Sequence, residues 1–252
     1  MIKLDTSWLQ HVQKPARYTG GEMNSVIKDH KDVDFTIAFG FPDVYEVAMS
    51  HLGIKILYGL VNEREDAYAE RVFAPWHDME EEMRKRNIPL YSLETKTPIK
   101  EFDVLGFSLQ YEMSYTNILN MLDLAGMPLY AKDRDLDMPL VMAGGPCAYN
   151  VEPIADFFDL VTLGESEEWF HEFIDVYKAQ KAAGFPGGKM GLLHELAKIP
   201  GTYCPALYEV SYTEAGDFEK ITPIFDDIPT NIEKRIIEDV ENVYYKTKPI
   251  VP

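Results

Sequence analysis

The chain has 252 residues, of which 46% are hydrophobic and 26% are charged, and its formal net charge is −18. These fractions are typical of a globular protein with a sizeable core. The negative charge opposes phosphate backbones and acidic lipids, so we expect no direct nucleic-acid binding and no membrane association. Two cysteines, Cys147 and Cys204, provide neither a disulfide framework nor a paired metal motif, which favours a reducing, cytoplasmic setting.

The first third of the chain predicts an arm followed by a strand and a helix. Residues 1–31 are polar and mixed, and we expect them to form an N-terminal arm with Trp8 as its main apolar anchor. An apolar run at 34–41, stopped by Pro42, predicts the first strand. Asp43 then caps a helix to about residue 62. Its apolar stripe, at steps of four residues, consists of Val44, Ala48, Leu52, Ile56 and Leu60.

Strands and helices alternate in the next part of the chain. Strands are predicted at 68–74, 102–109, 140–143 and 160–163, with a short additional strand at 90–93. Helices are predicted at 76–86, 114–125, 154–158 and 169–177, and we interpret the aromatic residues of the last one as core residues. This alternation predicts an α/β fold with a doubly wound, parallel, five-stranded sheet of the flavodoxin-like kind.

The pattern changes after about Ala183, at the glycine-rich segment 184–188. We therefore divide the chain into an α/β domain over 1–183 and a smaller α+β extension with a linker over 184–252. The extension is predicted to hold a short helix at 192–196 and a hairpin formed by 203–212 and 219–224. The prolines of 248–252 predict an extended strand or linker, so we expect the chain to be part of a longer protein.

The loops that follow the predicted strands supply the candidate site. In a parallel sheet these loops share one edge, where ligands bind, and glycines there let a ligand approach the backbone closely. No nucleophile, acid–base pair or metal-ligand set is evident among them, so the pattern favours holding a small-molecule cofactor over catalysis. The candidate cofactor-binding residues are Pro42, Asp43, Ser108, Leu109, Gln110, Tyr111, Gly144, Gly145, Pro146, Gly164 and Glu165.

Several of these residues also have a purely structural interpretation. Gly144 and Gly145 permit tight packing between a strand and the next helix, and Asp43 serves as an N-cap. We interpret His51 as a histidine inside a helix, not as a metal ligand, and Cys147 as a loop cysteine that packs inward.

Longer motifs resemble a known family. They are Phe41–Gly53, Arg71–Trp76, Gly106–Glu112, Asn117–Gly126, Ala143–Pro146, Gly164–Glu165 and Lys246–Pro252. Together they resemble the N-terminal, cobalamin-binding-like part of an uncharacterised family of radical S-adenosylmethionine (SAM) iron–sulfur proteins. The resemblance implies a radical SAM barrel after Pro252, which binds a 4Fe–4S cluster and SAM. It also implies that the whole protein is an enzyme and that this part is not itself catalytic.

The resemblance implies a cobalamin-type cofactor, with two departures: the S-x-L pattern of such folds is imperfect, because Ser108 is followed by Leu109 and Gln110, and a second motif is missing. The DxHxxG motif of cobalamin-binding folds is absent, because the segment 42–47 stands in its place and His51 lies too deep in the predicted helix to replace it. Gly144 and Gly145 match the glycine pair that lines the groove of the nucleotide tail in such folds. By the resemblance, Ser108, Gln110 and Tyr111 would contact the corrin ring.

Two alternatives remain open. The domain is a cofactor-free scaffold that docks the radical barrel or a partner, in which case Tyr111, Met113 and Tyr149 fill the groove. A flavin or nucleotide site is the weaker alternative, because no phosphate-binding loop follows the first strand.

Overall fold

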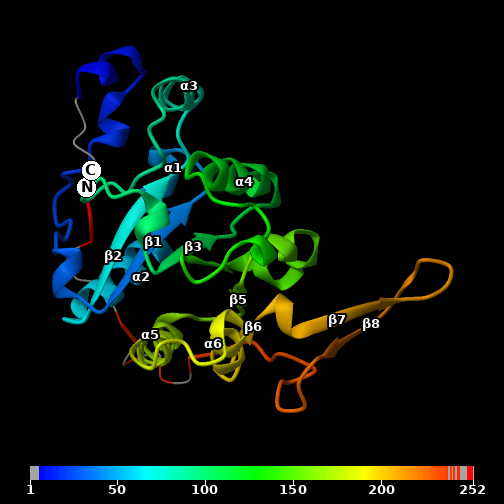
Figure 1. Ribbon diagram of the computed structural model, residues 1–252. Helices are drawn as coiled ribbons and strands as arrows, with labels where there is room; N and C mark the ends of the chain where they lie inside the picture. Colours follow the sequence, from blue (N-terminus) through cyan, green and yellow to red (C-terminus); the bar gives the residue numbers. More distant parts are fainter. Residues whose placement is uncertain (1–5, 238, 240, 242, 245–248, 252) are drawn as a thin grey trace.

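The fold is a six-stranded sheet with helices on both faces (Figure 1). The computed structural model describes residues 6–237, 239, 241, 243–244 and 249–251. The strand order is β2-β1-β3-β4-β5-β6; the first five strands pair in parallel and β6 pairs antiparallel to β5. The strands are β1 (Phe35–Phe41), β2 (Ala67–Phe73), β3 (Val104–Ser108), β4 (Leu140–Gly144), β5 (Leu160–Thr162) and β6 (Thr202–Tyr203).

The predicted α/β class and the parallel sheet are confirmed, but the count of five strands is wrong. The sixth strand, β6, has only two residues, and the sequence pattern merged it with the hairpin strand that follows. The two are separate because Leu207, in a short 3₁₀ turn between them, is fully buried in the core.

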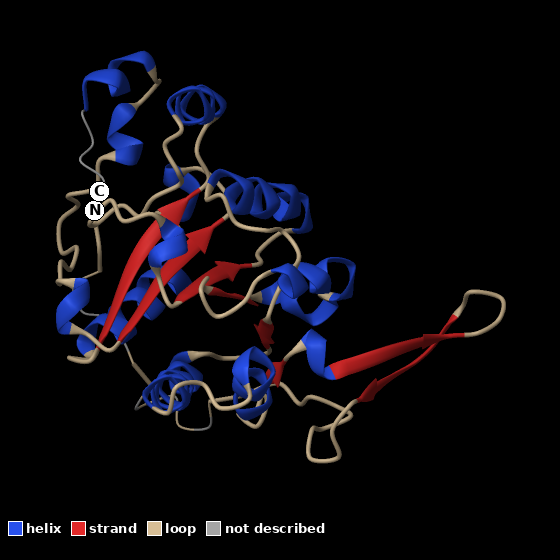
Figure 2. Cartoon of the chain, in the orientation of Figure 1, coloured by secondary structure: helices blue, strands red, loops and turns tan. Residues whose placement is uncertain are grey.

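Helices cover the sheet in two layers, visible in Figure 2. Successive residues of β1 alternate between two hydrophobic cores, because side chains of a strand point to opposite faces. Phe35, Ile37 and Phe39 belong to the core beneath α2, α5 and α6, whereas Ala38 belongs to the core beneath α3 and α4. The helices are α1 (Tyr45–Ala48), α2 (Leu52–Glu63), α3 (His77–Arg86), α4 (Tyr115–Leu124), α5 (Glu167–Ala182) and α6 (Gly188–Leu196).

The helix predicted over 43–62 is interrupted. A short α1 ends at Ala48, and α2 begins at Leu52 with His51 as its N-cap. The interruption shifts the phase of the buried face, so Leu52, predicted on the apolar stripe, is 59% exposed. The buried residues of α2 are Ile54, Tyr58, Gly59, Leu60, Val61 and Asn62.

Two further elements differ from the predictions. The segment 90–93 is not a sheet strand, because Tyr91 forms only an isolated bridge with Pro98. The helix predicted over 154–158 is replaced by two 3₁₀ turns, Pro146–Asn150 and Glu152–Phe157, each with a proline at its start. Proline lacks the N–H that a continuous α-helix across these turns would need.

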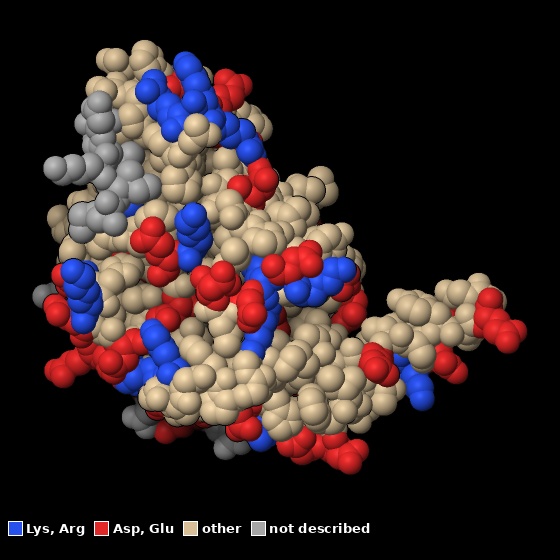
Figure 3. Space-filling view, in the orientation of Figure 1, with Lys and Arg blue, Asp and Glu red and all other residues tan. Residues whose placement is uncertain are grey.

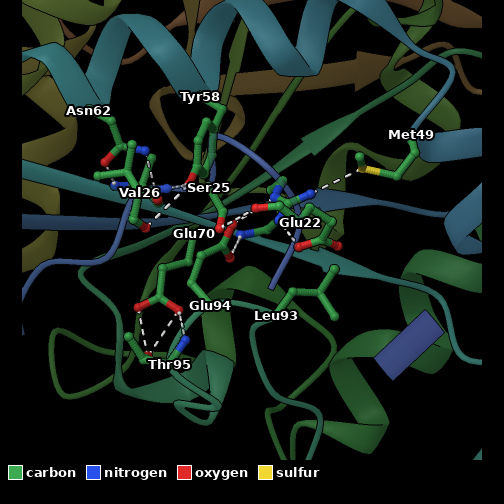
Figure 4. A network of polar contacts seen from close by, with 12 residues as sticks. Glu22, Ser25, Val26, Met49, Tyr58, Asn62, Glu70, Leu93, Glu94 and Thr95 are labelled. Atoms are coloured by element: carbon green, nitrogen blue, oxygen red, sulfur yellow. Dashed lines mark hydrogen bonds and ion pairs between the residues drawn. The ribbon is translucent and has the colours of Figure 1, made fainter. Parts of the chain in front are cut away.

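The N-terminal arm packs along the β2 edge of the sheet. Trp8 is buried as predicted. A β2 polar cluster, defined by Glu22, His30, Glu70, Arg71 and Glu94, joins the arm to the strand. Figure 4 shows its three carboxylates, Glu22, Glu70 and Glu94.

A second, two-stranded sheet projects from the body. It consists of β7 (Tyr208–Tyr212) and β8 (Phe218–Pro223), so the predicted hairpin is confirmed with a later start (Figure 1). The linker predicted over 248–252 lies partly outside the described residues; within it, Val251 bridges antiparallel to Met23. Among the described residues, no helix is long and apolar enough to cross a bilayer.

Candidate functional site

An edge pocket of about 210 Å³ lies at the carboxyl ends of β1, β3, β4 and β5. It is bounded by these strand ends and by the N-terminal ends of α2 and α5. The chain leaves β1 toward β2 on one side and returns to β3 on the other, so the pocket lies at a topological switch point. Crevices at such points are the usual ligand sites of open α/β sheets.

The pocket combines an apolar floor with a few polar groups, as small-molecule sites generally do. Phe39, Met142 and Phe170 contribute apolar side chains from β1, β4 and α5. His51 and Ser108 contribute polar side chains from the start of α2 and the end of β3. All five residues come from elements that the two cores hold in place.

His51 caps α2 and also lines the edge pocket. Its Nδ1 accepts a hydrogen bond from the Ile54 N–H at 3.3 Å. In a neutral imidazole the proton then lies on Nε2, which makes Nε2 a donor and not a metal ligand. The ring folds back over Gly53, where a Cβ atom would come within 2.8 Å of the imidazole Cε1. Gly53 is thus the residue type that allows this histidine position.

Ser108 and Gln110 form the polar side of the pocket. The Gln110 Nε2 donates to the Ser108 Oγ at 2.7 Å, and both side chains line the pocket. Between them, Leu109 is fully buried in the opposite core, and its N–H donates to the Gly144 carbonyl at 2.7 Å. The alternation along β3 therefore directs Ser108 to the pocket and Leu109 away from it.

The structure brings together six of the eleven candidate residues around this pocket. They are Ser108, Gln110, Gly144, Gly145, Gly164 and Glu165. Pro146 lines a neighbouring hollow of about 400 Å³, which shares Gly145, Gly164 and Glu165 with the edge pocket.

The other four candidates lie elsewhere. Pro42 and Asp43 follow β1 and make structural contacts. The Pro42 carbonyl accepts from Asn117 Nδ2 of α4 at 2.9 Å. The Asp43 Oδ1 accepts from the Val44 N–H at 2.7 Å. Asp43 therefore precedes the N-cap of α1, which is Val44. Leu109 is buried, and Tyr111 is 61% exposed outside the pocket.

The three glycines among the candidate residues lie against the chain's own atoms. A Cβ at Gly144 would come within 2.8 Å of the Thr162 methyl group, and one at Gly145 within 2.9 Å of the Leu109 carbonyl oxygen. Gly164, at φ 99°, forms a parallel bridge with Arg235, whose backbone fills the space beside it. Close packing of the chain is thus a sufficient reason for glycine at all three positions.

The rim next to α5 is acidic. Glu165 and Glu167 line the pocket, while Arg235 pairs with Glu168 at 3.1 Å and with Glu172 at 2.5 Å on the outer side. The hydrogen bond from Arg235 lowers the pKa of Glu172 and outweighs the effect of its burial. Arg235 is engaged with the outer pair and Glu165 accepts a hydrogen bond from the Ile237 N–H, so an anionic ligand group would meet the negative charge of Glu165 and Glu167 at this rim.

Sequence reasoning missed the α2 side of the pocket. The four-residue apolar steps predict one continuous helix that contains both His51 and Gly53, and histidine is not among the usual N-cap residues that would mark a helix start at this point. Of the three side chains expected to fill the groove in a cofactor-free scaffold, Tyr111 and Met113 are 61% and 74% exposed and do not line the edge pocket, whereas Tyr149 lines the neighbouring hollow.

Comparison with known proteins identifies a family whose model matches more than half of the chain. The model of radical SAM proteins, N-terminal, matches residues 53–205. Uncharacterized protein MJ0966 of Methanocaldococcus jannaschii is 38% identical over 87 residues, which cover 33% of this chain and 18% of that protein. The match therefore spans less than a fifth of the relative's length. No solved structure matches the chain.

Proposed function

The chain belongs to the family of radical SAM proteins, N-terminal, and we propose that it holds an organic cofactor of the cobalamin type beside a radical SAM domain in the same protein. The edge pocket carries this proposal, because it lies at the switch point of the sheet and has an apolar floor with a few polar groups. The radical SAM domain would hold the iron–sulfur cluster and SAM, since this chain has only two cysteines.

The size of the pocket limits what enters it. Pockets that enclose drug-sized ligands measure roughly 300–1,000 Å³. At about 210 Å³ the edge pocket is smaller, so it fits the narrow end of a cofactor and not a whole macrocycle. A corrin ring would lie outside.

The donor set also limits the chemistry. Because His51 Nδ1 accepts from Ile54, its Nε2 is suited to donate a hydrogen bond to a ligand oxygen or nitrogen and not to ligate cobalt. A cobalamin-type cofactor, when bound, supplies methyl transfer or radical chemistry. In our proposal His51 and Ser108 orient its narrow end, and Phe39 and Phe170 exclude water.

One observation favours a second candidate, a cofactor-free docking domain. Gly144, Gly145 and Gly164 lie against the chain's own atoms, and Glu165 and Glu167 oppose a phosphate at the pocket. In that case the exposed side chains Tyr111 and Met113 contribute to a contact surface.

Retention of a corrin distinguishes the two candidates. The full-length protein is mixed with hydroxocobalamin and desalted, and the retained corrin absorbance is measured for the native protein, Ser108→Leu and Ser50→Leu. Ser108 lines the pocket, whereas Ser50 is exposed outside it, so the same change of side chain blocks the pocket in one variant only.

We expect the native protein and Ser50→Leu to retain the corrin and Ser108→Leu to lose it. Retention by none of the three proteins supports the docking domain. Equal retention by all three places the cofactor on another surface and overturns the role of the edge pocket.

A further inference from the structure

The hairpin formed by β7 and β8 carries an apolar face that the body covers only at its base, among the described residues. Its register pairs Tyr208 with Pro223, Val210 with Ile221 and Tyr212 with Phe218. Alternate residues of a strand share a face, so these six apolar side chains lie on one side of the hairpin. Glu209, Ser211, Lys220 and Thr222 lie on the other side.

A β-bulge maintains this separation. The register shifts between Ser211 and Tyr212, which leaves Glu219 as an extra residue opposite Ser211. Without the extra residue, Phe218 would point to the polar side and Glu219 to the apolar side. The Ser211 Oγ donates to Glu219 Oε2 at 3.0 Å, which holds the bulged residue on the polar side.

The face is anchored at its base and bare toward its tip. The Tyr208 ring lies 5.1 Å from the Tyr203 ring, and its hydroxyl donates to the Pro229 carbonyl at 2.8 Å. Toward the tip, Tyr212 and Phe218 are 63% and 61% exposed, and the hairpin extends away from the sheet and helices (Figure 1). A two-stranded hairpin on its own is only marginally stable in water, so an uncovered aromatic face on one indicates a missing partner.

We infer that this face docks against the radical SAM domain of the same protein, an inference that rests on the proposed function for the existence of that domain. The size of the face supports a partner in the same chain. Six side chains are far fewer than the roughly 20–30 residues that each partner contributes to a stable interface between separate proteins. A tethered domain is present at millimolar effective concentration and needs no larger contact.

The charge around the face defines the chemistry of the docking surface. The hairpin has acidic side chains at positions 209, 214, 217 and 219 and one basic side chain, Lys220, and Figure 3 shows acidic groups toward its free end. The complementary surface is an apolar patch ringed by lysine and arginine. Docking therefore weakens as salt rises.

Hydrogen exchange in the full-length protein tests the inference. The double variant Tyr212→Ser/Phe218→Ser removes the two exposed aromatic side chains, and Ile27→Ser/Val47→Ser, which removes two exposed apolar side chains away from the hairpin, is its control. Neither variant touches the core, so exchange within β1, β3 and β4 reports that the body remains folded. Light scattering gives the molecular mass of each protein.

We expect the aromatic variant to raise exchange about tenfold in one contiguous segment of the radical SAM domain, while the control and the monomeric mass are unchanged. Exchange that changes only within the hairpin overturns the inference. So does a native dimer that the aromatic variant dissociates, because the occupant is then a second copy.

Corrin retention separates this inference from the proposed function. A protein that retains no corrin but shows the exchange response supports docking and contradicts the cofactor role. A protein that retains the corrin in the edge pocket without the exchange response overturns docking alone.

Discussion

The β2 polar cluster and the edge pocket lie on the same sheet but use their polar groups in opposite ways. In the cluster, Arg71 is 1% exposed and pairs with Glu22 at 2.8 Å and with Glu94 at 2.6 Å (Figure 4). In the pocket, within the part of the chain that the structure describes, one ring nitrogen of His51 accepts from the Ile54 N–H and the Ser108 Oγ accepts from the amide of Gln110.

The difference separates a structural site from a candidate binding site. Charged groups that are buried and paired with one another are expensive to disturb, which suits a structural site. Polar groups with unused capacity beside an apolar floor suit a ligand and contribute less to stability. The predictions below test this contrast.

Replacement of Arg71 by methionine has the largest expected effect. It leaves the carboxylates of Glu22 and Glu94 buried without their cation, which costs about 3–5 kcal/mol. Urea unfolding measures the loss. Arg84→Met is the control, because Arg84 pairs with Glu80 and Asp123 on the exposed surface and its loss costs at most about 1 kcal/mol. Equal losses for the two variants would contradict the structural role of the cluster.

Acid removes the stability that two carboxylates of the cluster, Glu22 and Glu70, contribute. Burial is the largest single influence on the pKa of Glu22 and would raise it, but the charge of Arg71 and the hydrogen bonds of the carboxylate together hold that pKa below its ordinary value. Burial also opposes the ionisation of Glu70. Hydrogen bonds from His30, Ser92 and Thr95 favour the ionised carboxylate and together outweigh burial, so the pKa of Glu70 is lowered as well.

A lowered pKa contributes stability above the unfolded-state value, about 4.3 for glutamate, and this stability is lost as the pH falls through the folded-state value. We therefore expect the unfolding free energy to be level from about pH 6 to 7 as far as these two groups are concerned, and to fall below about pH 4.5. Glu22→Gln should reduce this acid slope; an unchanged slope would show that Glu22 has no lowered pKa.

Changes at His51 separate its two roles. His51→Ala removes the N-cap acceptor of α2 and should cost about 1 kcal/mol in thermal or urea unfolding. His51→Asn restores a good cap and should recover most of that stability, yet it lacks the Nε2 donor and should still weaken cofactor retention. If His51→Asn retained the corrin fully, the Nε2 of His51 would have no role in binding the cofactor.

The smallest expected effect tests the interrupted helix. Leu52 is exposed, so Leu52→Ala should change stability by less than about 0.5 kcal/mol. Leu60 lies on the buried face of the same helix, so Leu60→Ala should reduce the unfolding free energy by about 2–5 kcal/mol. If the two variants lost similar amounts of unfolding free energy, Leu52 would be buried as well, as the continuous helix predicted from the sequence requires.

The sheet was predictable because its strands are apolar runs that end at glycine, proline or polar residues. Ser108 and Gly164 were placed on one edge from chain order alone, since parallel strands share their carboxyl ends. The break at Met49–His51 was not predictable from periodicity, because apolar residues on both sides of it continue at four-residue steps.

The partners of the glycines were also beyond the sequence. Gly164 contacts Arg235, which is 71 positions away, and no local pattern links the two. The same holds for β6, whose two residues join the sheet through pairing with β5. Contacts of this kind depend on how the whole chain folds.

Hydrogen exchange of the full-length protein with and without hydroxocobalamin tests the central claim most directly, because it locates the ligand. We predict slower exchange in segments 51–57, 106–110 and 164–170, which line the edge pocket, and no change around Arg71. Protection confined to other segments, or none in the presence of a retained corrin, would contradict the assignment of the pocket as the binding site.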